Sequence, residues 1–224
     1  MKTINTENTI KRFHREGNQN LRYASFDFCY LYFQENKGQL SQNMENSCSH
    51  LWSYLASWGM LRNSKLRLCS PAALKPLIEH FDIADNELWT LDVDQYNERT
   101  IQLLINEYKE IEDILCKILY GEKGVKHLSL TLITKIMLGV YGNIPAFDTY
   151  FIQTFHGLYG GFGVCGKSEL RKIYDFYIEY KELIDELFEE IKVIDFDGHS
   201  TKYHYKKAKL IDMYGFSQNA PENN

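Results

Sequence analysis

The sequence predicts an all-α protein, a compact domain of orthogonally packed helices. Three observations favour this fold class. Apolar residues recur mostly at steps of three and four, which is the period of an α-helix. Strict alternation of β-branched residues is rare, and the chain has only 4 prolines in 224 residues to interrupt helices. A hydrophobic fraction of 44% with 25% charged residues is typical of a globular protein.

A chain of this length can bury one substantial core or divide into two small lobes. We expect a single domain over residues 1–216, or two helical lobes that meet near residues 82–95. Residues 217–224 are polar and are expected to form a disordered tail.

Three shorter helices are predicted in the first half of the chain, over residues 25–35, 47–61 and 71–81. The third is marked by "SPAALKPLIEHF". There Ser70 can cap the helix, and Pro71 occupies the first helical position, where a proline is tolerated.

The clearest amphipathic helix is predicted over residues 99–119. It ends at "YGEKG", where Gly121 and Gly124 can stop a helix. Its apolar stripe consists of Ile101, Leu104, Ile105, Tyr108, Ile111, Leu115, Ile118 and Leu119.

The segment over residues 128–142, "LSLTLITKIMLGVYG", is apolar nearly all round. A helix of this kind is expected to be the most buried one of the fold. Its only interior charge is Lys135.

Three further helices are predicted toward the C-terminus. The stretch "FDTYFIQTFHGLY" is typical of a helix, and a second amphipathic stripe covers residues 168–191. The last helix is expected over residues 200–214, with Ser200 or Thr201 as its cap.

Composition restricts the compartment and the partners. No stretch approaches the roughly 20 apolar residues of a membrane span, and the beginning, "MKTINTENTIKRFHREG", lacks the apolar core of a signal peptide. We therefore expect a cytoplasmic protein without a membrane partner. The five cysteines are odd in number and form no C-x-x-C pair, which favours reduced thiols; they are Cys29, Cys48, Cys69, Cys116 and Cys165.

The formal net charge of -5 provides no general attraction to nucleic acid. Binding to DNA would therefore need a local basic face. Aromatic residues make up 14% of the chain and could stack on bases, although they more often fill a core.

Asp148 is the main candidate for a catalytic carboxylate. It follows "NIPAF" and precedes an apolar helical stretch, so it can serve as a helix N-cap. The same position holds a carboxylate in place beside the positive end of the helix. Such a group could stabilise an oxocarbenium-like sugar or activate a water.

The stretch "LITKIMLGVYGNIPAFDTYF" resembles the end of the core of helix-hairpin-helix DNA glycosylases, in which an apolar helix, a short loop with proline and an aspartate precede the next helix. The resemblance covers residues 120–155. It implies that Asp148 serves cleavage of the N-glycosidic bond of a modified base flipped from double-stranded DNA. No cofactor and no metal are implied.

The family's hairpin resembles "L-P-G-V-G", whereas this chain has "GEKGVKHLSLTL" at that place. If the resemblance holds, Lys123, Lys126 and His127 contact a DNA phosphate there. Bifunctional members add a Schiff-base lysine, but neither Lys126 nor Lys135 stands at the expected distance from Asp148. We therefore expect a monofunctional enzyme.

The sequence leaves two interpretations open for the environments of Lys135 and Trp58. Lys135 is either a catalytic amine with a lowered pKa or, as we favour, a lysine whose charged end reaches the surface. In "SHLWSYLASWGMLRNS", Trp58 could stack on an extruded base and Arg62 could bind phosphate. A core helix followed by a solvated basic loop explains the same residues and is preferred.

Two other motifs are weak. "GFGVCGKS", from Gly161 to Ser168, satisfies the P-loop pattern with Lys167, but it lacks a preceding β-strand, so nucleotide binding is a remote alternative. "DFDGHSTKYHY" contains acids and histidines without a recognised metal spacing, and we expect only a turn at Asp197 and Gly198.

Besides the glycosylase hypothesis, a non-catalytic helical binding protein remains the main alternative.

Overall fold

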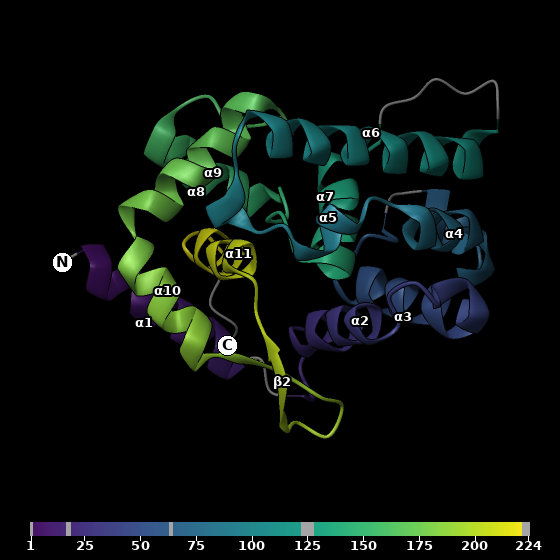
Figure 1. Cartoon of the computed structure of the whole chain (residues 1–224), viewed down its shortest axis with the longest axis horizontal. Coiled ribbons are helices and arrows are strands. Elements are labelled where there is room, and N and C mark those ends of the chain that lie inside the picture. Colours follow the sequence, from purple (N-terminus) through teal and green to yellow (C-terminus); the bar gives the residue numbers. More distant parts are fainter. Residues whose placement is uncertain (1, 17–18, 63–64, 122–127, 221–224) are drawn as a thin grey trace.

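The computed structural model describes residues 2–16, 19–62, 65–121 and 128–220. In this part of the chain nearly all regular structure is helical, which confirms the predicted all-α class (Figure 1). The helices of the first half are α1 (Lys2–Glu16), α2 (Ala24–Glu35), α3 (Met44–Ser57), α4 (Lys75–Ile83), α5 (Asn86–Thr90) and α6 (Glu98–Tyr120). Those of the second half are α7 (Leu130–Tyr141), α8 (Thr149–Tyr159), α9 (Lys167–Glu179), α10 (Lys181–Glu190) and α11 (Lys207–Ser217).

Short 3-10 helices and one β-hairpin complete the fold. The 3-10 helices are η1 (Leu40–Asn43), η2 (Lys65–Leu68), η3 (Pro71–Leu74) and η4 (Val93–Gln95). Strands β1 (Lys192–Ile194) and β2 (Ser200–His204) pair antiparallel, with Lys192 opposite His204. The hairpin projects from the helices in Figure 1.

The helices form two groups that share one hydrophobic core. In the first group α2, α3 and α7 pack against one another, and α4 packs against α3. In the second group α11 lies centrally and packs against α1, α8 and α10 (Figure 1). The buried hydrophobic side chains of both groups belong to a single contiguous cluster.

The prediction for α7 is confirmed, because every residue from Leu132 to Tyr141 is buried. Helix α7 packs against α2, α3 and α6, so its apolar surface meets protein on all sides. It ends at Gly142, whose φ of 69° is in the left-handed region that favours glycine.

Two predictions in the C-terminal part were wrong. The expected helix over residues 168–191 is divided into α9 and α10 at Tyr180, whose φ of -114° and ψ of 24° are not helical. The buried apolar residues keep the helical spacing across this break, from Ile173 to Leu187, and so the sequence pattern does not show it. Residues 200–204 form β2 instead of the start of a helix, because Asp197 and Gly198 close a hairpin with Gly198 at a φ of 84°.

The five cysteines are free thiols. Within the expected tail, Gln218 and Asn219 donate side-chain hydrogen bonds to Thr9 and Thr154. Residues 221–224 lie outside the described residues. In the described ranges, no helix combines the length and the apolar character needed to cross a membrane.

Candidate active site

The loop between α7 and α8 is held rigidly by side chains of α7. Phe147 donates its backbone N–H to Thr134 Oγ1 at 2.8 Å, and its carbonyl accepts from Thr131 Oγ1 at 2.9 Å. Ile144, Ala146 and Phe147 are fully buried. This loop therefore leaves little freedom for the next residue, Asp148.

Asp148 is the N-cap of α8, as the sequence predicts. Its Oδ1 accepts a hydrogen bond from the backbone N–H of Phe151 at 2.9 Å. Only 8% of the residue is exposed. Burial raises the pKa of Asp148, while the ammonium of Lys135 acts in the opposite direction.

Lys135 lies beside this carboxylate. Its Nζ is 3.5 Å from Asp148 Oδ2 and 4.1 Å from the centroid of the Trp58 ring. The favoured expectation that Lys135 reaches the surface is wrong, because the residue is only 3% exposed and its charged end faces Asp148 and Trp58. Burial lowers the pKa of Lys135, and the carboxylates of Asp148 and Asp212 oppose that shift.

Lys135 and Asp148 line a pocket of about 560 Å³. Its walls include three aromatic rings, and Phe216 stands edge-on to both others, 5.5 Å from Trp58 and 5.3 Å from Tyr150 between ring centroids. Trp58 Nε1 is buried and has no hydrogen-bond partner among the described residues. The residues that line the pocket are Arg22, Trp58, Met60, Ser129, Thr131, Lys135, Asp148, Thr149, Tyr150 and Phe216.

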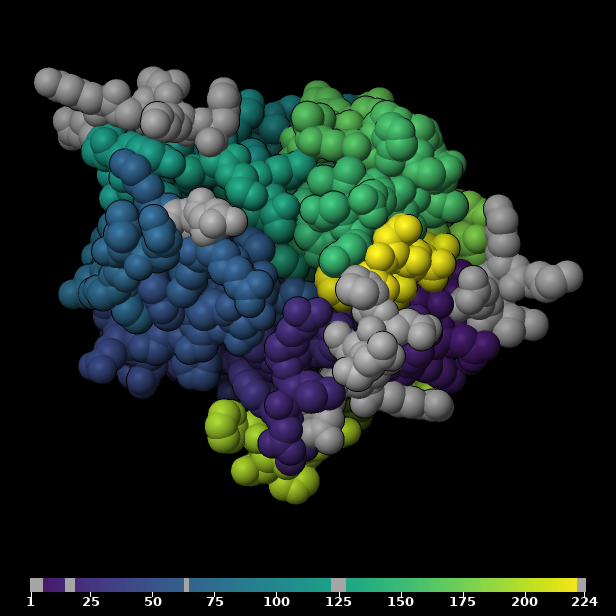
Figure 2. Space-filling view, turned by 180° about the vertical axis from the view of Figure 1, so that it is seen from behind, coloured from purple at the N-terminus to yellow at the C-terminus, as the bar shows by residue number. Residues whose placement is uncertain are grey.

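The pocket lies where the two groups of helices meet. Trp58 follows α3 and Lys135 is on α7, whereas Asp148 caps α8 and Phe216 is on α11. Figure 2 shows a face on which the yellow end of α11 adjoins the green surface of the α7–α8 region and the purple N-terminal segment.

Arg22 supplies a cation at the pocket. Its guanidinium carbon lies 5.1 Å from the ring centroid of Tyr23 and 5.7 Å from that of Trp58. In the ranges that the structure describes, it makes no salt bridge with a carboxylate and donates one hydrogen bond, to Tyr23 Oη at 3.4 Å. Stacking on these rings holds the guanidinium in place while its charge stays available.

Of the other residues predicted to contact DNA, only some lie at this pocket. Trp58 lines the pocket, but Arg62 is exposed and lies outside it, next to the turn at Gly59. Nearby, Lys65 Nζ lies 4.3 Å from the ring centroid of Tyr120. Lys123, Lys126 and His127 fall outside the described residues.

Sequence reasoning missed a second buried ion pair. Lys209 Nζ and Asp212 Oδ2 are 2.7 Å apart on α11, and both side chains are nearly inaccessible. Asp212 Oδ1 accepts from the backbone N–H of Ala146 at 3.0 Å, two residues before Asp148. The available signal was two opposite charges three residues apart within the apolar "KLIDMYGF".

The P-loop string lacks the structural context that its chemistry needs. Helix α8, and not a β-strand, comes before Gly161. Lys172 Nζ donates to the carbonyls of Gly160 and Gly161 at 2.8 and 2.6 Å, so these carbonyls, instead of phosphate-binding amides, meet a cation. Lys167 lies 4.0 Å from Glu98.

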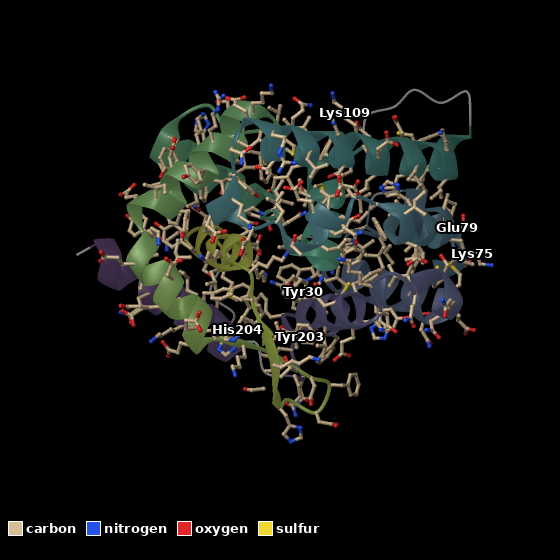
Figure 3. The ribbon with its side chains drawn as sticks, viewed as in Figure 1. Tyr30, Lys75, Glu79, Lys109, Tyr203 and His204 are labelled. Carbon is tan, nitrogen blue, oxygen red and sulfur yellow. The ribbon has the colours of Figure 1, made fainter. Side chains whose placement is uncertain are left out.

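A second hollow of about 430 Å³ lies beside β2, where Tyr30, Tyr203 and His204 are close together in Figure 3. Two of its three lysines, Lys206 and Lys207, are already paired. Lys206 Nζ donates to the carbonyls of Trp89 and Leu91, and Lys207 pairs with Asp94. Within the described residues, no group of three or more metal-binding side chains comes together.

No protein-family model, curated protein or solved structure matches the chain. The resemblance to helix-hairpin-helix DNA glycosylases therefore stays a prediction.

Proposed function

We propose that the chain is a DNA-glycosylase-like enzyme that hydrolyses the N-glycosidic bond of a modified base flipped out of double-stranded DNA. One observation carries the proposal: a helix-capping carboxylate and a buried lysine meet in a pocket with aromatic walls. The three rings provide flat apolar surface for a base, and stacking of a base on an aromatic side chain contributes about 1–3 kcal/mol.

Asp148 is the catalytic residue in this proposal. The N-glycosidic bond breaks with its electron pair leaving on the base, and positive charge develops on the sugar. The carboxylate of Asp148 stabilises that charge, and it accepts a proton from the water that adds to C1′. Lys135 supports this role, since its ammonium opposes the rise in the Asp148 pKa that burial causes.

Arg22 is the phosphate contact in this proposal. An arginine that stacks on aromatic rings, and that pairs with no carboxylate among the residues the structure describes, suits a phosphate oxygen of the nucleotide at the pocket. Because the chain is acidic overall, such local contacts must provide the attraction to DNA, and affinity should fall steeply with salt.

The test is base excision from a panel of duplexes that carry modified bases, together with a gel-shift titration at two salt concentrations. We expect Asp148→Asn to bind as wild type does and to lose base release. Arg22→Ala should weaken binding to all sequences alike. Asp85→Asn is the matched control, because Asp85 also caps a helix, α5, but does not line the pocket.

Absence of binding to any duplex at low salt would overturn the proposal. Binding of wild type without excision would support the alternative, a nucleic-acid-binding protein without chemistry. If borohydride traps a covalent complex between DNA and Lys135, the lysine attacks the sugar and the proposed hydrolysis by water is wrong.

A further inference from the structure

We propose that Asp212 is a positioning residue for the candidate active site. One of its carboxylate oxygens holds the loop that carries Asp148, and the other balances the buried charge of Lys209 behind the Lys135–Asp148 pair. The consequence of this inference for catalysis rests on the proposed function. The contacts of Asp212 are independent of that function.

The contacts of Asp212 reach the loop directly. Asp212 Oδ1 accepts from Ala146 N at 3.0 Å, and the carbonyl of Ala146 in turn accepts from Asp148 N at 2.9 Å. A shift of Asp212 would therefore be transmitted through one residue to Asp148. Asp212 is 4% exposed, so solvent does not compete effectively for these bonds.

The lysines of both ion pairs lie near the Trp58 ring. Lys135 Nζ lies 4.1 Å and Lys209 Nζ 5.9 Å from its centroid. Lys209 also lies 4.5 Å from the ring centroid of Phe26 and 5.1 Å from that of Phe13. Apolar rings around two cations and two carboxylates make any imbalance of charge costly.

The charges act on one another through this low-dielectric region. The carboxylate of Asp212 raises the pKa of both Lys135 and Asp148, and the ammonium of Lys209 lowers the pKa of Lys135. Other titratable groups also face this region from the packed helices: Cys29 and Asp27 on α2, Tyr54 on α3, and Tyr205 with the neighbouring His14 of α1.

Two single substitutions have opposite effects on Lys135. Asp212→Asn keeps an acceptor for the Ala146 amide but removes the negative charge, so the pKa of Lys135 should fall further. Lys209→Met removes the repelling cation, so the pKa of Lys135 should rise. A merely structural role would loosen the site in both variants and raise the pKa of Lys135 in both, toward that of an exposed lysine.

The experiment is an NMR titration of protein with ¹³C-labelled lysine, in which the Lys135→Arg spectrum identifies the Lys135 signal. We expect the midpoint of Lys135 to move down in Asp212→Asn, up in Lys209→Met, and to lie between those of the two single variants in the double variant that removes both charges. Shifts of Lys135 in the same direction in both single variants would overturn the inference. If Asp212→Asn does not fold, an unchanged or lowered midpoint in Lys209→Met overturns it instead.

This titration needs no substrate, so its outcome is separate from that of the excision assay. If excision is observed, the pH profile of Asp212→Asn should shift in the same direction as the NMR midpoint. If no duplex is cleaved while the midpoints move as expected, the proposed function fails and the charge coupling stands.

Discussion

Asp148 has two separable roles in the structure, one in the helix and one in the pocket. Both Asp148→Asn and Asp148→Ala remove the charge that faces Lys135, but only the asparagine keeps an acceptor for the amide of Phe151. We expect Asp148→Ala to be less stable than Asp148→Asn by about 0.5–2 kcal/mol, the usual contribution of an N-cap. Urea unfolding of both variants measures this difference. Equal stability would mean that the hydrogen bond to Phe151 contributes nothing to α8.

Local sequence was sufficient to predict the cap and insufficient to predict the environment of Lys135. An aspartate before an apolar helix is a signal within a few residues of the chain. The burial of Lys135 depends on Trp58, Asp148 and α11, which come from three other segments. Lys209 and Asp212 were missed for the same reason, because their pairing in the core depends on the helices that enclose α11.

At the scale of single elements, the contact between α3 and α7 fixes one side of the pocket. A Cβ atom on Gly139 would lie 2.5 Å from Tyr54 Cε1, which is too close for a carbon contact. We expect Gly139→Ala to destabilise the protein by about 1–3 kcal/mol, despite the better helix propensity of alanine.

Gly157 in α8 is the matched control for that substitution. A Cβ atom there meets nothing within 4 Å, and so Gly157→Ala should stabilise the protein by about 0.5–1 kcal/mol. Thermal unfolding of the two variants provides the measurement. If Gly139→Ala were as stable as Gly157→Ala, the close packing of Tyr54 on α7 would be incorrect.

The elements that periodicity predicted well are those with a strong and uninterrupted pattern. The expected helices over residues 99–119 and 128–142 correspond to α6 and α7. The break at Tyr180 and the hairpin before α11 escaped prediction, because the hydrophobic stripe does not register a change of backbone direction. Helix α1 was not predicted, since its apolar residues, which include the buried Ile10 and Phe13, are few and gain their burial mainly from α11.

At the scale of the whole molecule, buried ionisable groups connect segments that are far apart in the sequence. Glu107 on α6 accepts from Tyr141 Oη at 2.7 Å and lies 2.9 Å from His80 Nε2 on α4, and it raises the pKa of His80. Asp27 on α2 accepts from the hydroxyl of Tyr205 and from the backbone N–H of Ile194. Folding of the core therefore requires these groups to be paired, and stability must depend on pH.

Asp27 gives the clearest expectation for that dependence. Burial raises the pKa of Asp27 to about 7 from an ordinary value of 3.8. Between these pH values the folded protein binds a proton that the unfolded chain releases, so this contribution to stability is complete below about pH 4 and is lost as the pH rises through 7. Asp27→Asn keeps an acceptor for Tyr205 and Ile194 but cannot titrate. We therefore expect the stability of wild type relative to Asp27→Asn to fall by on the order of 3 kcal/mol between pH 4 and 8. Chemical denaturation at several pH values measures this change, with Asp197→Asn at the exposed hairpin turn as the control substitution. A difference between wild type and Asp27→Asn that is constant over this range would show that Asp27 is ionised in the folded core.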